Sequence, residues 1–141
     1  MTSDRVTAAG TRAVLTPAQI AATADSMVAQ QLKDGRLPWH AGDVEPHGAL
    51  DVVPRVGLVA GRHAEAEKAY EWLVASQRPD GSWASYYHYG GSVKDPNTDA
   101  NICAYVAVGV WHHYLVTGDI GFLHDLWPVV ERAIDMVLDL Q

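Results

Sequence analysis

Hydrophobic residues near the start of the chain recur at the spacing of one helix face. Most lie three or four residues apart, in the series Ile20, Ala24, Met27, Val28 and Leu32. Thr16 precedes them as an N-cap, with Pro17 at the first helical position and Gln19 three residues after the cap, a combination typical of helix starts. Gly35 is a stop signal. The pattern predicts a helix that begins after Thr16 and ends at residues 33–35.

Two more helices are predicted in the middle of the chain. The first covers residues 48–60, where Asp51 as the N-cap would leave Pro54 in the tolerated first turn. The second covers residues 63–77 and has an apolar face formed by Ala66, Ala69, Tyr70 and Leu73. Residues 36–46 and 78–98 have no apolar period and contain prolines and glycines, so they are predicted loops.

The last third of the chain begins with a different kind of helix, predicted over residues 99–117. Residues 102–111 are apolar all round, which is typical of a helix enclosed by protein. A β-strand is excluded by the Asp/Asn start, the length and the Gly118-Asp119 stop. A brief helical segment from Asp119 to Asp125 is then expected, followed by an amphipathic helix with Trp127, Val130, Ile134, Val137 and Leu138 on its apolar face.

No segment has the pattern of a strand, so the predicted fold class is all-α. Residues 1–15 lack apolar periodicity and are expected to be a mobile lead-in to a single domain over residues 16–141. Among the tryptophans, Trp72, Trp111 and Trp127 fall at core positions of predicted helices, whereas Trp39 and Trp83 fall in loops.

A short motif occurs twice along the chain. Gln31-Leu-Lys-Asp-Gly35 is followed by Trp39, and Gln77-Arg-Pro-Asp-Gly81 is followed by Trp83, with the two glutamines 46 residues apart. A period of this length indicates a helical repeat whose units bury their apolar faces by stacking. A third copy would begin at Gln141, so we expect the chain to be part of a longer domain.

The lengths of the loops predict how the helices are arranged. Long loops join the first helix to the second and the third to the fourth, while the other connections are short, so both long loops lie at one end. The amphipathic first, third and fifth helices are then outer, and the second and fourth are inner. This describes a partial α/α toroid of about two and a half helical hairpins.

Composition and charge exclude several classes of function. The 141 residues include 10 Lys and Arg, scattered singly, against 17 Asp and Glu, for a net charge of −7, which argues against binding nucleic acid or anionic lipid. The single cysteine cannot form an internal disulfide. No signal sequence and no membrane span are recognisable, so we expect a cytoplasmic protein.

Two stretches resemble known α/α-toroid families. Lys68 to Trp83 looks like the QW repeat of terpenoid cyclases and related prenyltransferases, where the motif joins an outer helix to the next loop. Thr98 to Asp119, continuing through Trp127-Pro128, resembles six-hairpin glycosidases such as glucoamylase-like enzymes. From about Thr16 onward the chain is similar to the N-terminal portion of actinobacterial proteins labelled prenyltransferase. Those proteins have Pro-Trp-Asp-His-Val-Glu where this chain has Pro46 to Asp51.

The resemblance implies a substrate cavity at the loop-rich end. Asp51 and Asp99, at the starts of the two inner helices, are the candidate catalytic residues, because glycoside hydrolysis uses one carboxylic acid on the leaving oxygen and a second carboxylate. Aspartate at a helix start is also commonly only a cap. The candidate substrate-binding residues are Trp39, Asp43, Tyr86, Tyr87, His88 and Asn101, with Glu45, His47, Tyr89 and Asp95 at the same end. Aromatic rings beside carboxylates suit either a sugar or a carbocation.

A metal site is the weaker alternative for this region, and no metal or cofactor is expected. Asp99 and Cys103 share a helical face and could bind zinc with His88. A cysteine in an apolar helix is more often part of the core. His112 and His113 point about 100° apart on a helix and cannot chelate together, so we expect one to pack and one to face outward.

Three functions remain open. The first is a prenyltransferase-type or cyclase-type enzyme acting on an isoprenoid, although no Asp-x-Asp-Asp or Asp-Asp-x-x-Asp motif occurs. The alternative is a carbohydrate-active enzyme that acts on a glycoside. The third is a non-enzymatic helical repeat, able to self-associate through exposed inner helices. This part of the protein is expected to be inactive alone.

Overall fold

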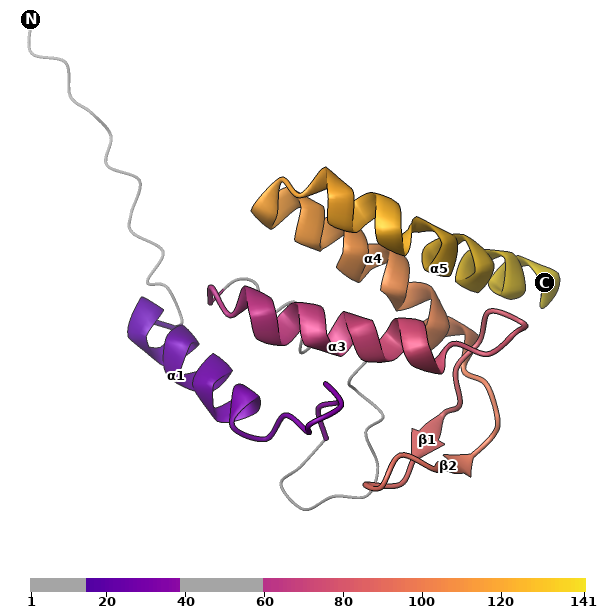
Figure 1. Ribbon diagram of the computed structural model, residues 1–141, viewed down its shortest axis with the longest axis horizontal. Coiled ribbons are helices and arrows are strands. Elements are labelled where there is room, and N and C mark those ends of the chain that lie inside the picture. Colours follow the sequence, from indigo (N-terminus) through magenta and orange to yellow (C-terminus); the bar gives the residue numbers. More distant parts are fainter. Residues whose placement is uncertain (1–14, 39–59) are drawn as a thin grey trace, which may run out of the picture.

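The computed structural model describes residues 15–38 and 60–141 of the chain. The elements in these ranges are α1 (Pro17–Val28), α3 (His63–Ser76), β1 (Tyr86–Tyr87), β2 (Val93–Asp95), α4 (Ala100–Thr117) and α5 (Ile120–Asp139). The fold class is all-α, as predicted. The lead-in before residue 15 and almost all of the helix predicted over residues 48–60 lie outside the described residues. Figure 1 shows α3 between α1 and the antiparallel pair α4 and α5.

The start of α1 follows the sequence signal and its end does not. The Gln19 N–H donates to Thr16 Oγ1 at 3.2 Å, and the Thr16 N–H donates to Gln19 Oε1 at 2.8 Å, forming a capping box. The helix ends at Val28, several residues before Gly35. The predicted extension to residues 33–35 is wrong because the chain leaves the helix to place the Gln31 amide against two carbonyl groups described below.

Caps and glycine define the helix boundaries in the C-terminal half. Asp99 Oδ1 accepts the Ile102 N–H at 3.1 Å at the start of α4, and Gly118, with φ of 71°, ends it. Asp119 Oδ1 then accepts the Phe122 N–H at 3.0 Å and caps α5. The bounds of α3 and α4 therefore agree with the prediction to within one residue.

The predicted break near Asp125 is wrong, because α5 is one continuous helix that contains Pro128. Proline removes one backbone hydrogen bond from a helix interior. The helix nevertheless continues because its apolar face is buried on both sides of the proline, at Leu126, Val129, Val130 and Ala133. Burial of a leucine or valine side chain stabilises by about 1.5–3 kcal/mol, so Leu126, Val129 and Val130 together outweigh the lost hydrogen bond.

The prediction that the chain contains no strand is also wrong. Antiparallel β1 and β2 pair Tyr86 with Asp95 and Tyr87 with Val93, with an irregular register between Tyr86 and Tyr87. The strands have two and three residues, which is too short for an alternating pattern to be recognised. The hairpin lies beside the C-terminal end of α3 and the start of α4 (Figure 1).

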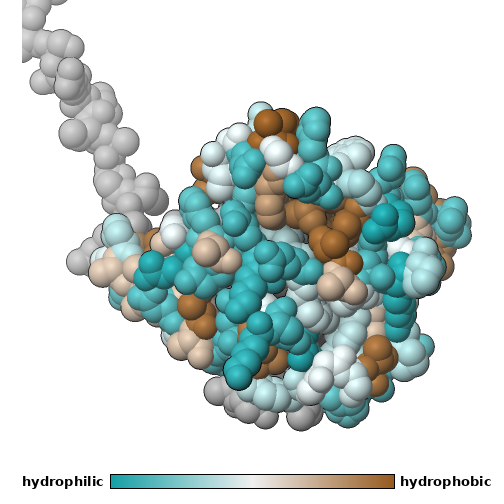
Figure 2. Space-filling model, in the orientation of Figure 1, coloured by the Kyte–Doolittle hydropathy of each residue, from teal (hydrophilic) through white to brown (hydrophobic). Residues whose placement is uncertain are grey.

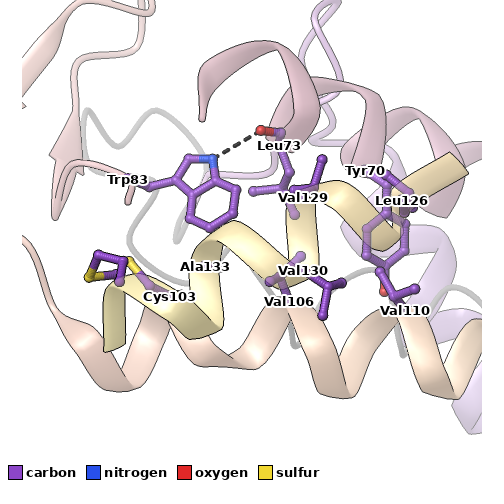
Figure 3. Packing of buried hydrophobic residues seen from close by; sticks show 11 residues of the cluster. Tyr70, Leu73, Trp83, Cys103, Val106, Val110, Leu126, Val129, Val130 and Ala133 are labelled. Atoms are coloured by element: carbon purple, nitrogen blue, oxygen red, sulfur yellow. Dashed lines mark hydrogen bonds between the residues drawn. The ribbon is translucent and has the colours of Figure 1, made fainter. Parts of the chain in front are cut away.

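The main core lies between α3, α4 and α5 and includes the loop residue Trp83 (Figure 3). The Trp83 side chain is only 1 % exposed, and its Nε1–H donates to the Leu73 carbonyl at 3.0 Å. Trp111 and Trp127, expected in the core, are 53 % and 55 % exposed. Helical spacing alone misplaced them, because α4 is apolar all round and the buried face of α5 runs through Leu126, Val129 and Val130 instead of Trp127.

Within the part of the chain that the structure describes, helix α4 is enclosed on one side only. Cys103, Val106 and Val110 are buried in the core, whereas the side chains opposite are 40–62 % exposed: Tyr105, Val108, Trp111 and Leu115. The face of the molecule in Figure 2 is mainly hydrophilic, with hydrophobic residues gathered in separate patches. Self-association through the exposed side of α4 stays a prediction. Within the described residues, no helix has the length and apolarity needed to cross a bilayer.

Candidate functional site

The two copies of the repeated motif have the same backbone structure. In the first turn, residues 31–37, the Leu32 N–H donates to the Arg36 carbonyl at 2.8 Å, and the Gly35 N–H donates to the Leu32 carbonyl at 3.0 Å. In the second turn, residues 77–83, Arg78, Ser82 and Gly81 form the equivalent bonds at 2.9 Å. The two copies of the motif therefore share the same turn hydrogen bonds.

Each glutamine bonds its turn to a later helix, α3 or α5. Gln31 Nε2 donates to the Gly35 carbonyl at 2.9 Å and to the Glu65 carbonyl in α3 at 2.8 Å. Gln77 Nε2 donates to the Gly81 carbonyl at 3.0 Å and to the Val129 carbonyl in α5 at 2.9 Å. Because both amide protons are used for backbone carbonyls, these glutamines are structural residues.

Glycine is required in both turns for two reasons. Gly35 and Gly81 have φ of 98° and 88°, in the left-handed region that L side chains rarely adopt. A Cβ atom added to Gly35 would lie 2.1 Å from the Lys68 carbonyl oxygen, and one added to Gly81 would lie 2.1 Å from the Arg132 carbonyl oxygen. The turns therefore touch the backbones of α3 and α5 directly.

Arg36 connects the first turn to the β-hairpin. Its side chain is 3 % exposed, and its Nε–H donates to Asp34 Oδ2 at 2.7 Å. Its Nη1 and Nη2 groups donate to the carbonyls of His88 and Tyr89, each at 2.8 Å. The guanidinium carbon also lies 5.8 Å from the centre of the Trp72 ring, within the range of cation–π attraction. These bonds place Arg36, at the start of the first predicted long loop, against the hairpin in the second.

A small pocket lies where these loops meet. It has a volume of about 330 Å³ and is lined by Leu32, Lys33, Asp34, Arg36 and Tyr89. This volume is near the lower limit of small-molecule sites. Lys33 and Asp34 come from the first turn, and Tyr89 comes from the β-hairpin. The pocket therefore combines residues that are more than 50 positions apart in the sequence.

The structure gives the predicted substrate-binding residues different environments. Tyr87 is buried, its phenolic oxygen accepts the Ala84 N–H at 3.0 Å, and its ring meets Trp72 edge-on at 5.1 Å between centroids. Burial raises the pKa of the Tyr87 phenol above its usual value. Tyr86 is half-buried, while His88 and Asn101 are exposed. Only the exposed and half-buried residues present side-chain surface to a ligand.

Of the two predicted catalytic aspartates, one is described. Asp99 is exposed and caps α4, which leaves its predicted catalytic role untested. Asp51 lies outside the described residues, as do the predicted substrate-binding residues Trp39 and Asp43 and their neighbours Glu45 and His47. Asp99, Asn101 and the hairpin residues lie on one continuous segment between β1 and the first turn of α4.

The alternative metal ligands do not come together. Cys103 is 2 % exposed in the main core, and burial raises the pKa of its thiol. No group of three His, Cys, Asp or Glu side chains within residues 15–38 and 60–141 is placed to hold a metal ion. The expectation that this cysteine is a core residue is confirmed.

One of the paired histidines packs inside the molecule, as predicted. His113 is fully buried, stacks on Phe122 at 3.7 Å between ring centroids, and has Nε2 at 3.1 Å from Glu67 Oε1. Its Nδ1 lies 3.3 Å from Thr117 Oγ1. His112 is half-buried rather than fully outward. Both ring nitrogens of His113 have partners, which is the arrangement of a structural histidine.

Sequence reasoning missed Lys33, Asp34 and Arg36 as part of this site. One signal was present, because alignment of the two motifs places Arg36 opposite Ser82. A buried arginine in place of serine indicates a long-range partner, since guanidinium groups are buried only when they are paired. The partner itself could not be inferred from the sequence alone.

The comparisons with known proteins point to carbohydrate chemistry. No protein-family model matches the chain. A curated protein of Mycolicibacterium hassiacum, MMP endo-(1,4)-3-O-methyl-alpha-D-mannosidase, is 44 % identical over 133 residues, which is 94 % of this chain. The chain spans about a third of the length of that protein, 36 %. The similarity supports the glycosidase alternative rather than the prenyltransferase interpretation, and it gives no support to an isoprenoid substrate.

Proposed function

We propose that this chain is part of a glycoside hydrolase that cleaves internal α-(1,4) bonds in a chain of 3-O-methylmannose residues. The proposal rests on the 44 % identity to the mannosidase, which extends over 94 % of the chain. An all-α fold in which Arg36 contacts the hairpin of the second long loop agrees with a helical-hairpin enzyme. We further propose that the helices form part of an α/α toroid, with the substrate at the loop-rich end.

Asp99 is the described residue that we propose for the chemistry. Hydrolysis of a glycosidic bond needs one carboxylic acid that protonates the leaving oxygen and a carboxylate that attacks or activates water. Asp99 is exposed and follows the hairpin directly, while only Oδ1 is used for the helix cap. We assign Asp51 to the partner carboxylate on the sequence alone. Tyr86, His88 and Asn101 would contact the sugar.

The experiment compares two aspartates that have the same structural role. Asp99 and Asp119 each cap a helix through Oδ1, which accepts a backbone N–H at 3.1 and 3.0 Å. Asparagine caps helices as well as aspartate does, so Asp99→Asn and Asp119→Asn should both leave the stability unchanged. We expect Asp99→Asn to lower kcat on 3-O-methylmannose oligosaccharides at least a hundredfold, because acid–base catalysis contributes about 10²–10⁴-fold, and Asp119→Asn to leave kcat unchanged.

Two results would contradict the proposal at different levels. Equal activity of the two variants would remove Asp99 from the mechanism while leaving the substrate assignment intact. A full-length wild-type protein that leaves 3-O-methylmannose oligosaccharides uncleaved, judged by product chromatography, would overturn the function itself.

A further inference from the structure

The pocket between the first turn and the β-hairpin has walls of two chemical kinds. Leu32 and the half-exposed Tyr89 ring, 51 % accessible, provide apolar surface. The exposed Lys33 and the Asp34 carboxylate, which is 44 % accessible, provide a hydrogen-bond donor and an acceptor. A neutral sugar ring needs this combination, because its C–H face packs on an aromatic ring while its hydroxyl groups bond to charged side chains.

The pocket is held in shape by a buried residue. Arg36 fixes the backbone of Tyr89 through the carbonyl at 2.8 Å and holds the Asp34 carboxylate at 2.7 Å from its Nε. Gly91 supplies the positive φ, 94°, that the hairpin turn beside Arg36 adopts. One guanidinium group therefore sets the spacing between the aromatic wall and the carboxylate wall, which reduces the entropy lost when a ligand binds.

The second turn shows that the repeat does not require this arrangement. Ser82 stands where the first turn has Arg36, and its hydroxyl group donates to Asp80 Oδ1 at 2.7 Å. The Asp80 carboxylate thus keeps the same place in the turn without a link to another loop. Arg36 and the Tyr89 wall are additions to a structural motif that is complete without them.

We propose that this pocket is a subsite for one neutral sugar ring of an extended glycan, with Tyr89 as its stacking platform and Asp34 and Lys33 as its hydroxyl partners. The proposal deepens the function proposed above and rests on it for the class of ligand. In a 3-O-methylmannose chain, the methyl group and the C–H face would meet Leu32 and Tyr89, and the free hydroxyl groups would meet the charged side chains.

Calorimetric titration of the full-length protein with a defined 3-O-methylmannose oligosaccharide tests the subsite. Tyr89→Ala should raise the dissociation constant about tenfold, because aromatic stacking contributes up to about 1.5 kcal/mol, and Tyr89→Phe should keep most of the affinity. Val93→Ala is the matched control, since Val93 is 48 % exposed on the other strand of the same hairpin. It should bind as the wild type does.

A second pair of variants tests the carboxylate. Asp34→Asn should weaken binding several-fold, whereas Asp80→Asn, at the same place in the second turn, should leave binding unchanged.

An unchanged affinity in Tyr89→Ala, or an equal loss in Val93→Ala, would overturn the subsite while hydrolysis by the wild type still supported the function. Binding of another neutral glycan that depends on Tyr89, without cleavage of 3-O-methylmannose chains, would support the subsite and overturn the function. A protein that binds no neutral glycan would overturn both.

Discussion

The first turn, residues 31–37, and the second turn, residues 77–83, share their hydrogen bonds and differ in what they anchor. Leu37 of the first turn belongs to a small cluster with Ala69 of α3. Trp83 occupies the equivalent place in the second turn and belongs to the main core. Arg36 reaches another loop, whereas Ser82 bonds only within its own turn in the contacts described. The same backbone unit therefore carries the hydrophobic anchor in one copy and a link between loops in the other.

The largest difference in stability should appear when the hydrophobic residue at the end of each turn, Trp83 or Leu37, is truncated. Trp83→Ala should lower the free energy of unfolding by about 3–5 kcal/mol, because it leaves a cavity among α3, α4 and α5. Leu37→Ala should cost about 2 kcal/mol, near the low end for buried leucine, since its cluster within residues 15–38 and 60–141 holds Ala69 alone. Urea denaturation of both variants measures the contrast, and equal losses would show that the small cluster is as important as the main core.

The next contrast separates a steric clash from backbone strain. Gly81→Ala would combine a positive φ with a contact of 2.1 Å to the Arg132 carbonyl oxygen. Gly118 has φ of 71° and nothing within 4 Å of an added Cβ, so Gly118→Ala should cost only about 1–2 kcal/mol. We expect Gly81→Ala to cost at least about 2 kcal/mol more, as measured by thermal unfolding. Similar values would mean that α5 moves away from the turn without penalty.

A third change gives the first turn the serine that the second turn has at the equivalent position. Arg36→Ser should lower the free energy of unfolding by about 1–3 kcal/mol, because the carbonyls of His88 and Tyr89 lose their buried donor. The amide protons of His88 and Gly91, which bond within the hairpin, should exchange faster with solvent. Arg78→Ser is the control, since Arg78 makes one exposed bond to Thr98. Unchanged exchange in Arg36→Ser would show that the hairpin holds its position without the arginine.

The smallest expected effect is the loss of stability at low pH. Hydrogen bonds from the Ser82 hydroxyl and N–H groups lower the pKa of Asp80 below its usual value near 3.8. Its ionised form therefore contributes stability above that value, and the contribution disappears as the pH falls through the lowered pKa. Because the carboxyl is largely exposed, we expect well under 1 kcal/mol. Ser82→Ala should return the pKa toward its usual value in a carbon-detected NMR titration, and an unchanged pKa would exclude the serine as the cause.

Features fixed by neighbouring residues could be predicted from the sequence. The starts of α1, α4 and α5 follow from Thr16, Asp99 and Asp119, whose side chains bond three residues along the chain. The end of α4 follows from Gly118. Each of these signals acts within one helical turn, so no knowledge of the tertiary structure was needed.

Features fixed by distant residues could not be predicted. The early end of α1 depends on Glu65, which lies 34 residues after Gln31. The continuity of α5 through Pro128 depends on the core formed with α3 and α4. The hydrophobic pattern identified both helices but could not weigh these tertiary contacts against a local stop signal or a proline.

The candidate site divides in the same way. The sequence proposed the hairpin residues and Asp99 as site residues because they cluster in one loop, and their role stays a prediction. It missed the pocket because the partners of Arg36 lie 52 and 53 residues away. Tyr87 was predicted to bind substrate because it is aromatic, like its neighbours in the loop. Its ring is instead buried against Trp72.

The direction of the glutamine bonds has a consequence for synthesis on the ribosome. Gln31 and Gln77 each donate to a helix made later, at Glu65 and at Val129, which is 52 residues after Gln77. At about 5–20 residues per second, the Gln77 amide waits about 3–10 s for its acceptor. Each nascent turn is therefore completed by a helix that emerges later, and the fold grows in one direction, with the newest turn always the least protected from chaperones and proteases.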